Sequence, residues 1–169
     1  GVIIDKKIYK GYNGGGGELG HMVIEVGGDE CTCGRRGCFE VYSSATGLVR
    51  MTRQAMHEHP ESLMNGMAKP QDAGARLAFE AARHSDPAAC AVVNRYIHYL
   101  AEGCANIINI FQPQILCIGG GVSNEGDYLI NPLRELTMSM VYTRRGARNT
   151  EIVRAARKRC GNHRRIAFV

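Results

Sequence analysis

The 169-residue sequence lacks any apolar stretch that approaches the ~20 residues needed for a membrane-spanning helix. Its first residues also lack the charged, apolar and cleavage regions of a secretory signal peptide. No internal repeat or low-complexity linker is present. With 44% hydrophobic and 22% charged residues, the chain can bury a core as one globular domain or as one lobe of a larger enzyme. We therefore expect a soluble, cytoplasmic protein without a membrane partner.

Two further absences concern disulfides and nucleic acid. The seven cysteines are odd in number and scattered, which does not match a secreted disulfide framework. The net charge of +5 arises largely from basic residues near the C-terminus, with Glu151 the one acid among them. These basic residues are Arg144, Arg145, Arg148, Arg154, Arg157, Lys158, Arg159, Arg164 and Arg165. Without an aromatic stacking pattern or a recognition-helix pattern, this charge argues poorly for nucleic acid as a partner.

Periodicity predicts a mixture of helices and strands. Helical spacing of apolar residues predicts helices at about residues 44–57, 72–83, 87–112 and 129–140. β-prone runs predict strands at residues 2–4, 7–9, 22–26, 114–118 and 151–153, the first two forming a hairpin. A long helix, then a strand buried on both faces, then a glycine-rich loop is typical of an α/β fold.

A histidine and three cysteines form the most distinctive pattern in the chain. His21, Cys31, Cys33 and Cys38 follow the spacing H-x9-C-x-C-x4-C, and Zn²⁺ prefers four such nitrogen and sulfur ligands. Unbound reduced thiols are the alternative, since a disulfide between Cys31 and Cys33 would close a very small ring. Four protein ligands would leave no open position for water, so we expect the metal to shape the loop rather than to activate a nucleophile.

The same stretch closely resembles the signature of the ROK family (repressors, open reading frames, kinases). The motif E-x-G-H followed by C-x-C-G-x-x-G-C-x-E is carried by Glu18, Gly20, His21, Cys31, Cys33, Gly34, Gly37, Cys38 and Glu40. The resemblance covers about residues 1–156. It implies an actin-like, ribonuclease-H-like ATPase lobe of an ATP-dependent sugar kinase, with the sugar bound between two lobes.

The resemblance also implies a sugar site. Glu18, His21 and Glu40 are expected to bind sugar hydroxyls, with one His21 ring nitrogen on zinc and the other facing the sugar. Carboxylate and imidazole acceptors suit several hydroxyls at once, and metal binding would fix the tautomer of the ring. Taken alone, Glu18 and Glu40 could equally be solvated loop carboxylates.

The nucleotide side is implied by three glycines. Gly119, Gly120 and Gly121 follow the buried strand and resemble the family's adenosine-side loop, so ATP with Mg²⁺ is the expected cofactor. A tight structural turn is the alternative for these glycines.

The resemblance divides the chain into regions. Residues 1–156 correspond to the C-terminal lobe, with a sugar and zinc loop at 14–40, a helical part at 44–111 and a nucleotide-side strand and loop at 114–124. The family's catalytic Asp comes from an Asn-Asp pair in the N-terminal lobe, and this sequence contains no such pair. The Gly-Thr-Gly phosphate loop is also absent. We therefore expect an incomplete lobe, no catalytic residue in this chain, and negligible turnover by this chain alone.

The last residues depart from the family pattern. Where the family continues with a segment like LGNDAGIIG, residues 157–169 read RKRCGNHRRIAFV. Codons for that segment, read after dropping two bases, can encode RKRCGNHR. Our hypothesis is that this aberrant basic tail is a frameshifted ending, and a coding sequence without an insertion or deletion against close relatives would refute it.

Three functions remain open from the sequence. The first is phosphorylation of glucose to glucose 6-phosphate by ATP, within a protein expected to be a homodimer; N-acetylmannosamine and fructose are alternative hexoses. The second is the sugar-sensing domain of a transcriptional repressor of the same family. The third is a zinc-stabilised binding module whose cluster has no role in sugar binding.

Overall fold

The computed structural model describes residues 1–146 and 148–155, together with the backbone of residues 165–168. Its α-helices are α1 Phe39–Ser43, α2 Ala45–Glu58, α3 Leu63–Met67, α4 Leu77–Arg83, α5 Pro87–Phe111 and α6 Asp127–Met140. Its strands are β1 Ile3–Ile4, β2 Lys7–Ile8, β3 Ile115–Ile118, β4 Glu151–Arg154 and β5 Arg165–Phe168. Within the described residues, short 3-10 helices occur at η1 Leu19–His21, η2 Pro70–Asp72 and η3 Gly121–Glu125.

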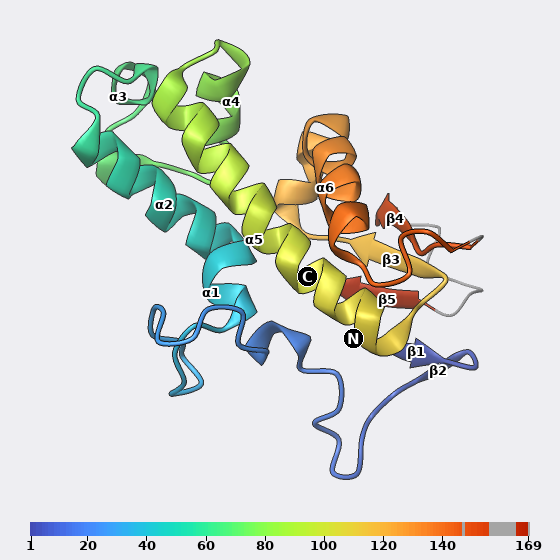
Figure 1. Cartoon of the computed structure of the whole chain (residues 1–169). Helices are drawn as coiled ribbons and strands as arrows, with labels where there is room; N and C mark the ends of the chain where they lie inside the picture. The colour runs from blue at the N-terminus through green and yellow to red at the C-terminus, as the bar shows by residue number, and fades with distance from the viewer. Residues whose placement is uncertain (147, 156–164, 169) are drawn as a thin grey trace.

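A parallel three-stranded sheet forms one layer of the molecule. Strand β3 lies in the centre, between β4 and β5, and pairs in parallel with both. Between β3 and β4 the chain passes through η3 and α6, as a parallel pair requires a crossover connection. The β1–β2 hairpin is a separate antiparallel pair, and in Figure 1 it lies beside this sheet.

The long helix α5 joins the sheet layer to the other helices. In Figure 1 it runs diagonally, with α1 and α2 on one side and α6 with the sheet on the other, while α4 packs beside its N-terminal end. The Asp86 carboxylate begins α5 by accepting the Ala89 N–H at 2.7 Å, and Pro87 occupies its first turn. Ile107 of α5, Leu116 of β3 and Leu129 of α6 are 0% exposed, so one part of the core lies where these three elements meet; the same core continues along α5 to α2, α3 and α4.

Most of the predicted elements are present. The hairpin is confirmed, with Asp5 and Lys6 at positive φ in its turn. The helices predicted at 44–57, 87–112 and 129–140 correspond to α2, α5 and α6, and the strands at 114–118 and 151–153 to β3 and β4. No described helix is long and apolar enough to cross a bilayer.

Two predicted elements were wrong in detail. No strand forms at residues 22–26, because the N–H groups of Ile24 and Glu25 both point to the Gly37 carbonyl and the chain then turns; only an isolated bridge joins Val23 to Cys38. The helix predicted at 72–83 begins only at Leu77, after η2.

Two five-residue helices, α1 and α3, were not predicted, since so few residues show no periodicity. Glu40 therefore lies on α1, where a loop had been expected. Of the tail at residues 157–169, positions 157–164 and 169 lie outside the described residues, and only the β5 backbone can be placed.

Candidate functional site

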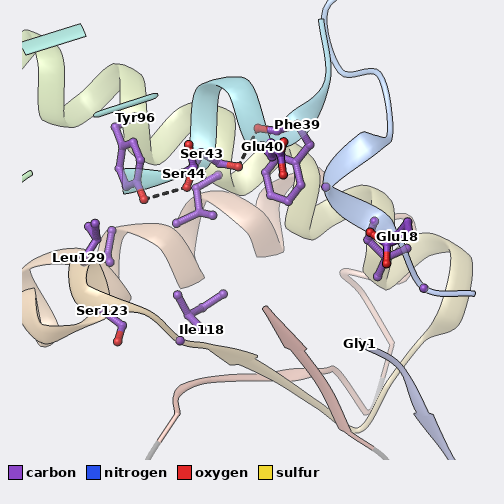
Figure 2. Close-up of a pocket in the computed structure, with 16 residues that line it drawn as sticks. Gly1, Glu18, Phe39, Glu40, Ser43, Ser44, Tyr96, Ile118, Ser123 and Leu129 are labelled. Carbon is purple, nitrogen blue, oxygen red and sulfur yellow. Dashed lines mark hydrogen bonds between the residues drawn. The ribbon is translucent and has the colours of Figure 1, made fainter. Parts of the chain in front are cut away.

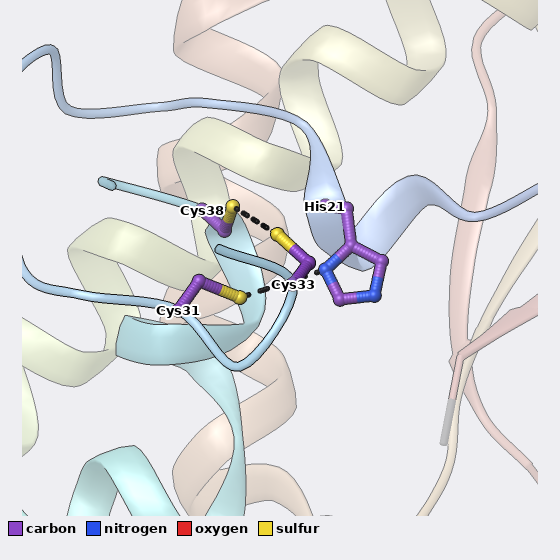
Figure 3. A group of neighbouring side chains, drawn as sticks. All are labelled: His21, Cys31, Cys33 and Cys38. Atoms are coloured by element: carbon purple, nitrogen blue, oxygen red, sulfur yellow. Dashed lines mark hydrogen bonds between the residues drawn. The ribbon is translucent and has the colours of Figure 1, made fainter. Parts of the chain in front are cut away.

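The predicted metal ligands form one compact cluster. The ligand atoms of His21, Cys31, Cys33 and Cys38 all lie within 4.8 Å of one another. The Cys31 Sγ lies 3.6 Å from His21 Nδ1, and the Cys33 Sγ lies 3.6 Å from the Cys38 Sγ. Figure 3 shows the His21 ring directing Nδ1 towards the sulfurs and its second nitrogen away from them.

These distances fit a tetrahedral zinc site. With Zn–S bonds of about 2.3 Å and a Zn–N bond of about 2.05 Å, the tetrahedral angle separates two sulfurs by about 3.8 Å and a sulfur from the nitrogen by about 3.6 Å. A disulfide would instead require an S–S distance of about 2.05 Å. Cys31, Cys33 and Cys38 are all free thiols. The donor set and its spacing therefore suit Zn²⁺.

Backbone hydrogen bonds fold the loop around the cluster. The Cys31 N–H donates to the Arg35 carbonyl at 2.8 Å, and the Gly34 N–H donates to the Cys31 carbonyl at 2.9 Å. Gly37 adopts φ +78°, and a Cβ there would lie 1.7 Å from the Glu25 oxygen. The loop can close on the cysteines only because position 37 carries no side chain.

The cluster residues differ in how readily they lose a proton. Burial raises the pKa of the Cys38 thiol to about 12, whereas a backbone hydrogen bond from Arg35 lowers the pKa of the exposed Cys33 thiol. The hydrogen bond with Cys31 raises the pKa of His21. Metal binding would have to displace these protons, so occupancy of the cluster should depend on pH.

A cavity of about 420 Å³ lies beside the cluster. Figure 2 shows Glu18 and Glu40 at its wall, with Ile118 and Ser123 across from them. A Cβ on Gly20 would lie 3.3 Å from the Glu40 Cβ and 3.4 Å from its Oε2, so the glycine of the E-x-G-H motif packs closely against Glu40.

Glu40 links the cavity to the metal cluster. It lies in the first turn of α1, directly after Cys38 and Phe39. The Cys31 Sγ lies 3.8 Å from the Glu40 Oε1. The cysteine loop thus runs directly into α1, the helix that carries Glu40. The conformation of the loop therefore sets the direction of the Glu40 side chain.

The glycine-rich turn borders the same cavity. Gly119, Val122 and Ser123 line it, at the carboxyl end of β3. Gly120 adopts φ +81° just before η3, and the Ser123 hydroxyl donates to the Gly120 carbonyl at 2.7 Å. In an open α/β sheet this end of the strands is the place where ligands bind.

The structure thus brings most predicted site residues together, with differences. Glu18, Glu40 and Gly119 share the cavity, while His21, Gly120 and Gly121 are not among its lining residues.

Sequence reasoning missed the apolar and hydroxyl-bearing part of the cavity wall, which includes Phe39, Ser43, Ser44, Tyr96 and Leu100. The Tyr96 hydroxyl donates to the Ser43 carbonyl at 2.9 Å across 53 positions of sequence. No local pattern in the sequence signals such a contact.

The fold is similar to that of solved sugar kinases of the actin-like class, of which the chain covers about half. More specifically, the chain belongs to the ROK family, whose model matches residues 1–163.

Relatives within the family include both kinases and repressors. The glucokinase of Thermotoga maritima is 39% identical over 142 residues, which cover 83% of this chain and 45% of the relative. The xylose repressor of Bacillus subtilis is 30% identical over 146 residues, which cover 86% of this chain and 34% of the repressor. The chain therefore spans less than half the length of these curated relatives.

A solved structure supports the fold. The ROK family glucokinase from Streptomyces griseus, in complex with glucose and AMPPNP, matches with a TM-score of 0.83 at 29% identity. The match covers 90% of this chain and 50% of that chain.

Proposed function

We propose that this chain supplies the sugar-binding wall and the nucleotide-side loop of an ATP-dependent hexose kinase, with glucose as the sugar and its 6-hydroxyl as the phosphate acceptor. The observation that carries the proposal is that Glu18 and Glu40 share one cavity with Gly119. A kinase needs its two substrates in contact, and this cavity offers carboxylates at one wall and a glycine-rich strand end at the other.

The carboxylates would recognise the sugar. Ionised Glu18 and Glu40 accept hydrogen bonds only, so each can take protons from sugar hydroxyls, and such charge-assisted bonds are about twice as strong as neutral ones. His21 does not line the cavity, but its second ring nitrogen points away from the sulfurs and would stay available to a sugar hydroxyl. Phe39 and Leu100 line the same cavity and would cover the apolar face of the sugar ring.

The zinc cluster would act as a support for that wall. Held by His21, Cys31, Cys33 and Cys38, Zn²⁺ would fix the loop that runs into α1 and would fix the tautomer of His21. Metal analysis of the purified protein should find about one zinc per chain.

The nucleotide would bind at the glycine-rich turn. Residues without a Cβ let a phosphate or ribose approach the backbone closely, and Gly119 reaches the cavity. Mg²⁺ would neutralise the phosphates, as phosphoryl transfer requires. The general base is expected outside this chain.

A second candidate, a sugar-responsive repressor domain, has specific support in the similarity to the xylose repressor. It would use the same carboxylates and zinc loop to bind a sugar, without transferring phosphate. Nucleotide binding and turnover separate the two candidates.

The test is a coupled assay for ADP formation, run with glucose, N-acetylmannosamine, fructose and xylose on the protein encoded by the complete reading frame. We expect turnover with glucose, and a loss of at least about tenfold in kcat/KM for Glu18→Gln, the cost of one charge-assisted hydrogen bond. Glu58→Gln, an exposed carboxylate on α2, should have no effect. Sugar binding without ADP formation would favour the repressor, and zinc without sugar binding would favour a simple binding module.

A further inference from the structure

Glu125 is a buried carboxylate outside the cavity. Its side chain is only 3% exposed, and it is not among the residues that line the cavity. It ends η3, the turn that follows Gly119 and Gly120. Burial of a charged group is unfavourable unless that group is paired, so its partners indicate what it does.

Two arginines, Arg76 just before α4 and Arg83 at its end, converge on this carboxylate. Arg83, the last residue of α4, donates to Oε2 at 2.5 Å, and the Arg76 Nε lies 3.5 Å from Oε1. The two residues are seven positions apart and therefore lie on the same face of the helix. The Arg83 guanidinium also lies 5.1 Å from the ring centroid of Tyr128, the second residue of α6.

The turn that Glu125 ends depends on such contacts. Gly120 and Gly126 bound it at φ +81° and +64°, and neither provides a side-chain cap. On its other side, Arg154 of β4 donates to the Asn124 side chain. Because glycine is free to adopt many backbone conformations, tertiary contacts must select the orientation of η3.

We propose that Glu125 is a positioning residue for nucleotide binding: clamped by Arg83 and Arg76, it holds η3 so that Gly119 and Ser123 keep their place at the cavity. This inference rests on the proposed kinase function, since it assigns the nucleotide to that turn. Glu125 acts through the backbone of the turn and does not itself contact the ligand.

The test compares two ligands in one protein. Calorimetric titration of the full chain with AMPPNP and, separately, with glucose should show AMPPNP affinity about tenfold weaker in Glu125→Gln, with glucose affinity changed less than twofold. Glu80→Gln, an exposed carboxylate of the same helix α4, is the matched control and should bind both ligands normally. Arg83→Gln should reproduce the effect, and the double variant should bind no worse than either single one.

Hydrogen exchange gives a readout without ligand. The amides of residues 120–126 should exchange faster in Glu125→Gln, while those in the middle of α5 keep their wild-type rates. If Glu125→Gln does not fold, Arg76→Gln, whose side chain is 76% exposed, should give a smaller loss of AMPPNP affinity in the same direction.

The outcomes are distinguishable. Wild-type protein that does not bind AMPPNP contradicts both the proposed function and this inference. If the wild type and Glu125→Gln bind AMPPNP with equal affinity, the kinase proposal stands and the positioning role is overturned. Equal weakening of AMPPNP and glucose overturns it too, because it indicates general destabilisation.

Discussion

Replacing Gly103 by Ala should disturb the cavity wall through Phe39. Gly103 lies in the middle of α5, and a Cβ at this position would lie 2.1 Å from Cε2 and 2.3 Å from Cζ of the Phe39 ring. Carbon atoms in contact prefer about 3.5 Å or more, so the ring must move by at least about 1.4 Å. Phe39 is 2% exposed and has little room to move. Glu40 follows it directly, so the carboxylate should shift with the ring.

The magnitude follows from two opposing effects. Overpacking a core costs about 1–3 kcal/mol, whereas Ala in place of Gly in a helix contributes up to about 1 kcal/mol. We expect Gly103→Ala to lower the free energy of unfolding by about 1–2 kcal/mol in urea denaturation. Glucose affinity should fall as well, since small misplacements of binding groups are costly.

Gly66→Ala is the matched control. Gly66 lies within α3, and a Cβ there would meet no atom within 4 Å. The same chemical change should therefore leave stability unchanged or raise it by up to about 1 kcal/mol. Phe39→Leu should restore part of the stability lost in Gly103→Ala. Equal stability of the wild type and Gly103→Ala would refute the packing argument.

Further predictions concern the loop, the metal and pH. Gly37→Ala should reduce zinc content by metal analysis, because its Cβ would clash with the Glu25 carbonyl; full zinc occupancy would show that the loop tolerates a side chain there. Cys38→Ser should likewise reduce zinc content, and a chelator should destabilise the wild type but not this variant; equal sensitivity to chelator would argue against a bound metal. Asp86→Ala should cost about 1–2 kcal/mol of stability at pH 7 by loss of the α5 N-cap. Burial raises the pKa of Asp86, but hydrogen bonds from Ala89 and two other donors outweigh it, and the net pKa lies below its ordinary value of 3.8. The stabilisation by ionised Asp86 is therefore present above about pH 4 and is lost as the pH falls further. The free energies of unfolding of the wild type and Asp86→Ala should then converge in acid. A constant difference between them across that range would contradict the assignment.

Local signals explain which parts of the structure could be predicted. Asp86 and Pro87 begin α5 through contacts within one turn, and the cysteine spacing brings three ligands together within one loop. Each depends on residues close in sequence, so the sequence alone predicts it.

The remaining features depend on distant residues. The strand expected at residues 22–26 is absent because the Gly37 carbonyl takes the N–H groups that a ladder would use. The position of Glu40 depends on Phe39 meeting Gly103 across 64 positions of sequence. Such contacts appear only when the chain is folded.

The account rests most directly on Glu40 as a sugar ligand beside the metal cluster. Calorimetric titration of glucose into wild-type, Glu40→Gln and Glu58→Gln protein, each at equal zinc content, tests it. We expect Glu40→Gln to weaken glucose binding at least about tenfold and Glu58→Gln to bind like the wild type. Unchanged glucose affinity in Glu40→Gln would contradict the assignment of this cavity as the sugar site.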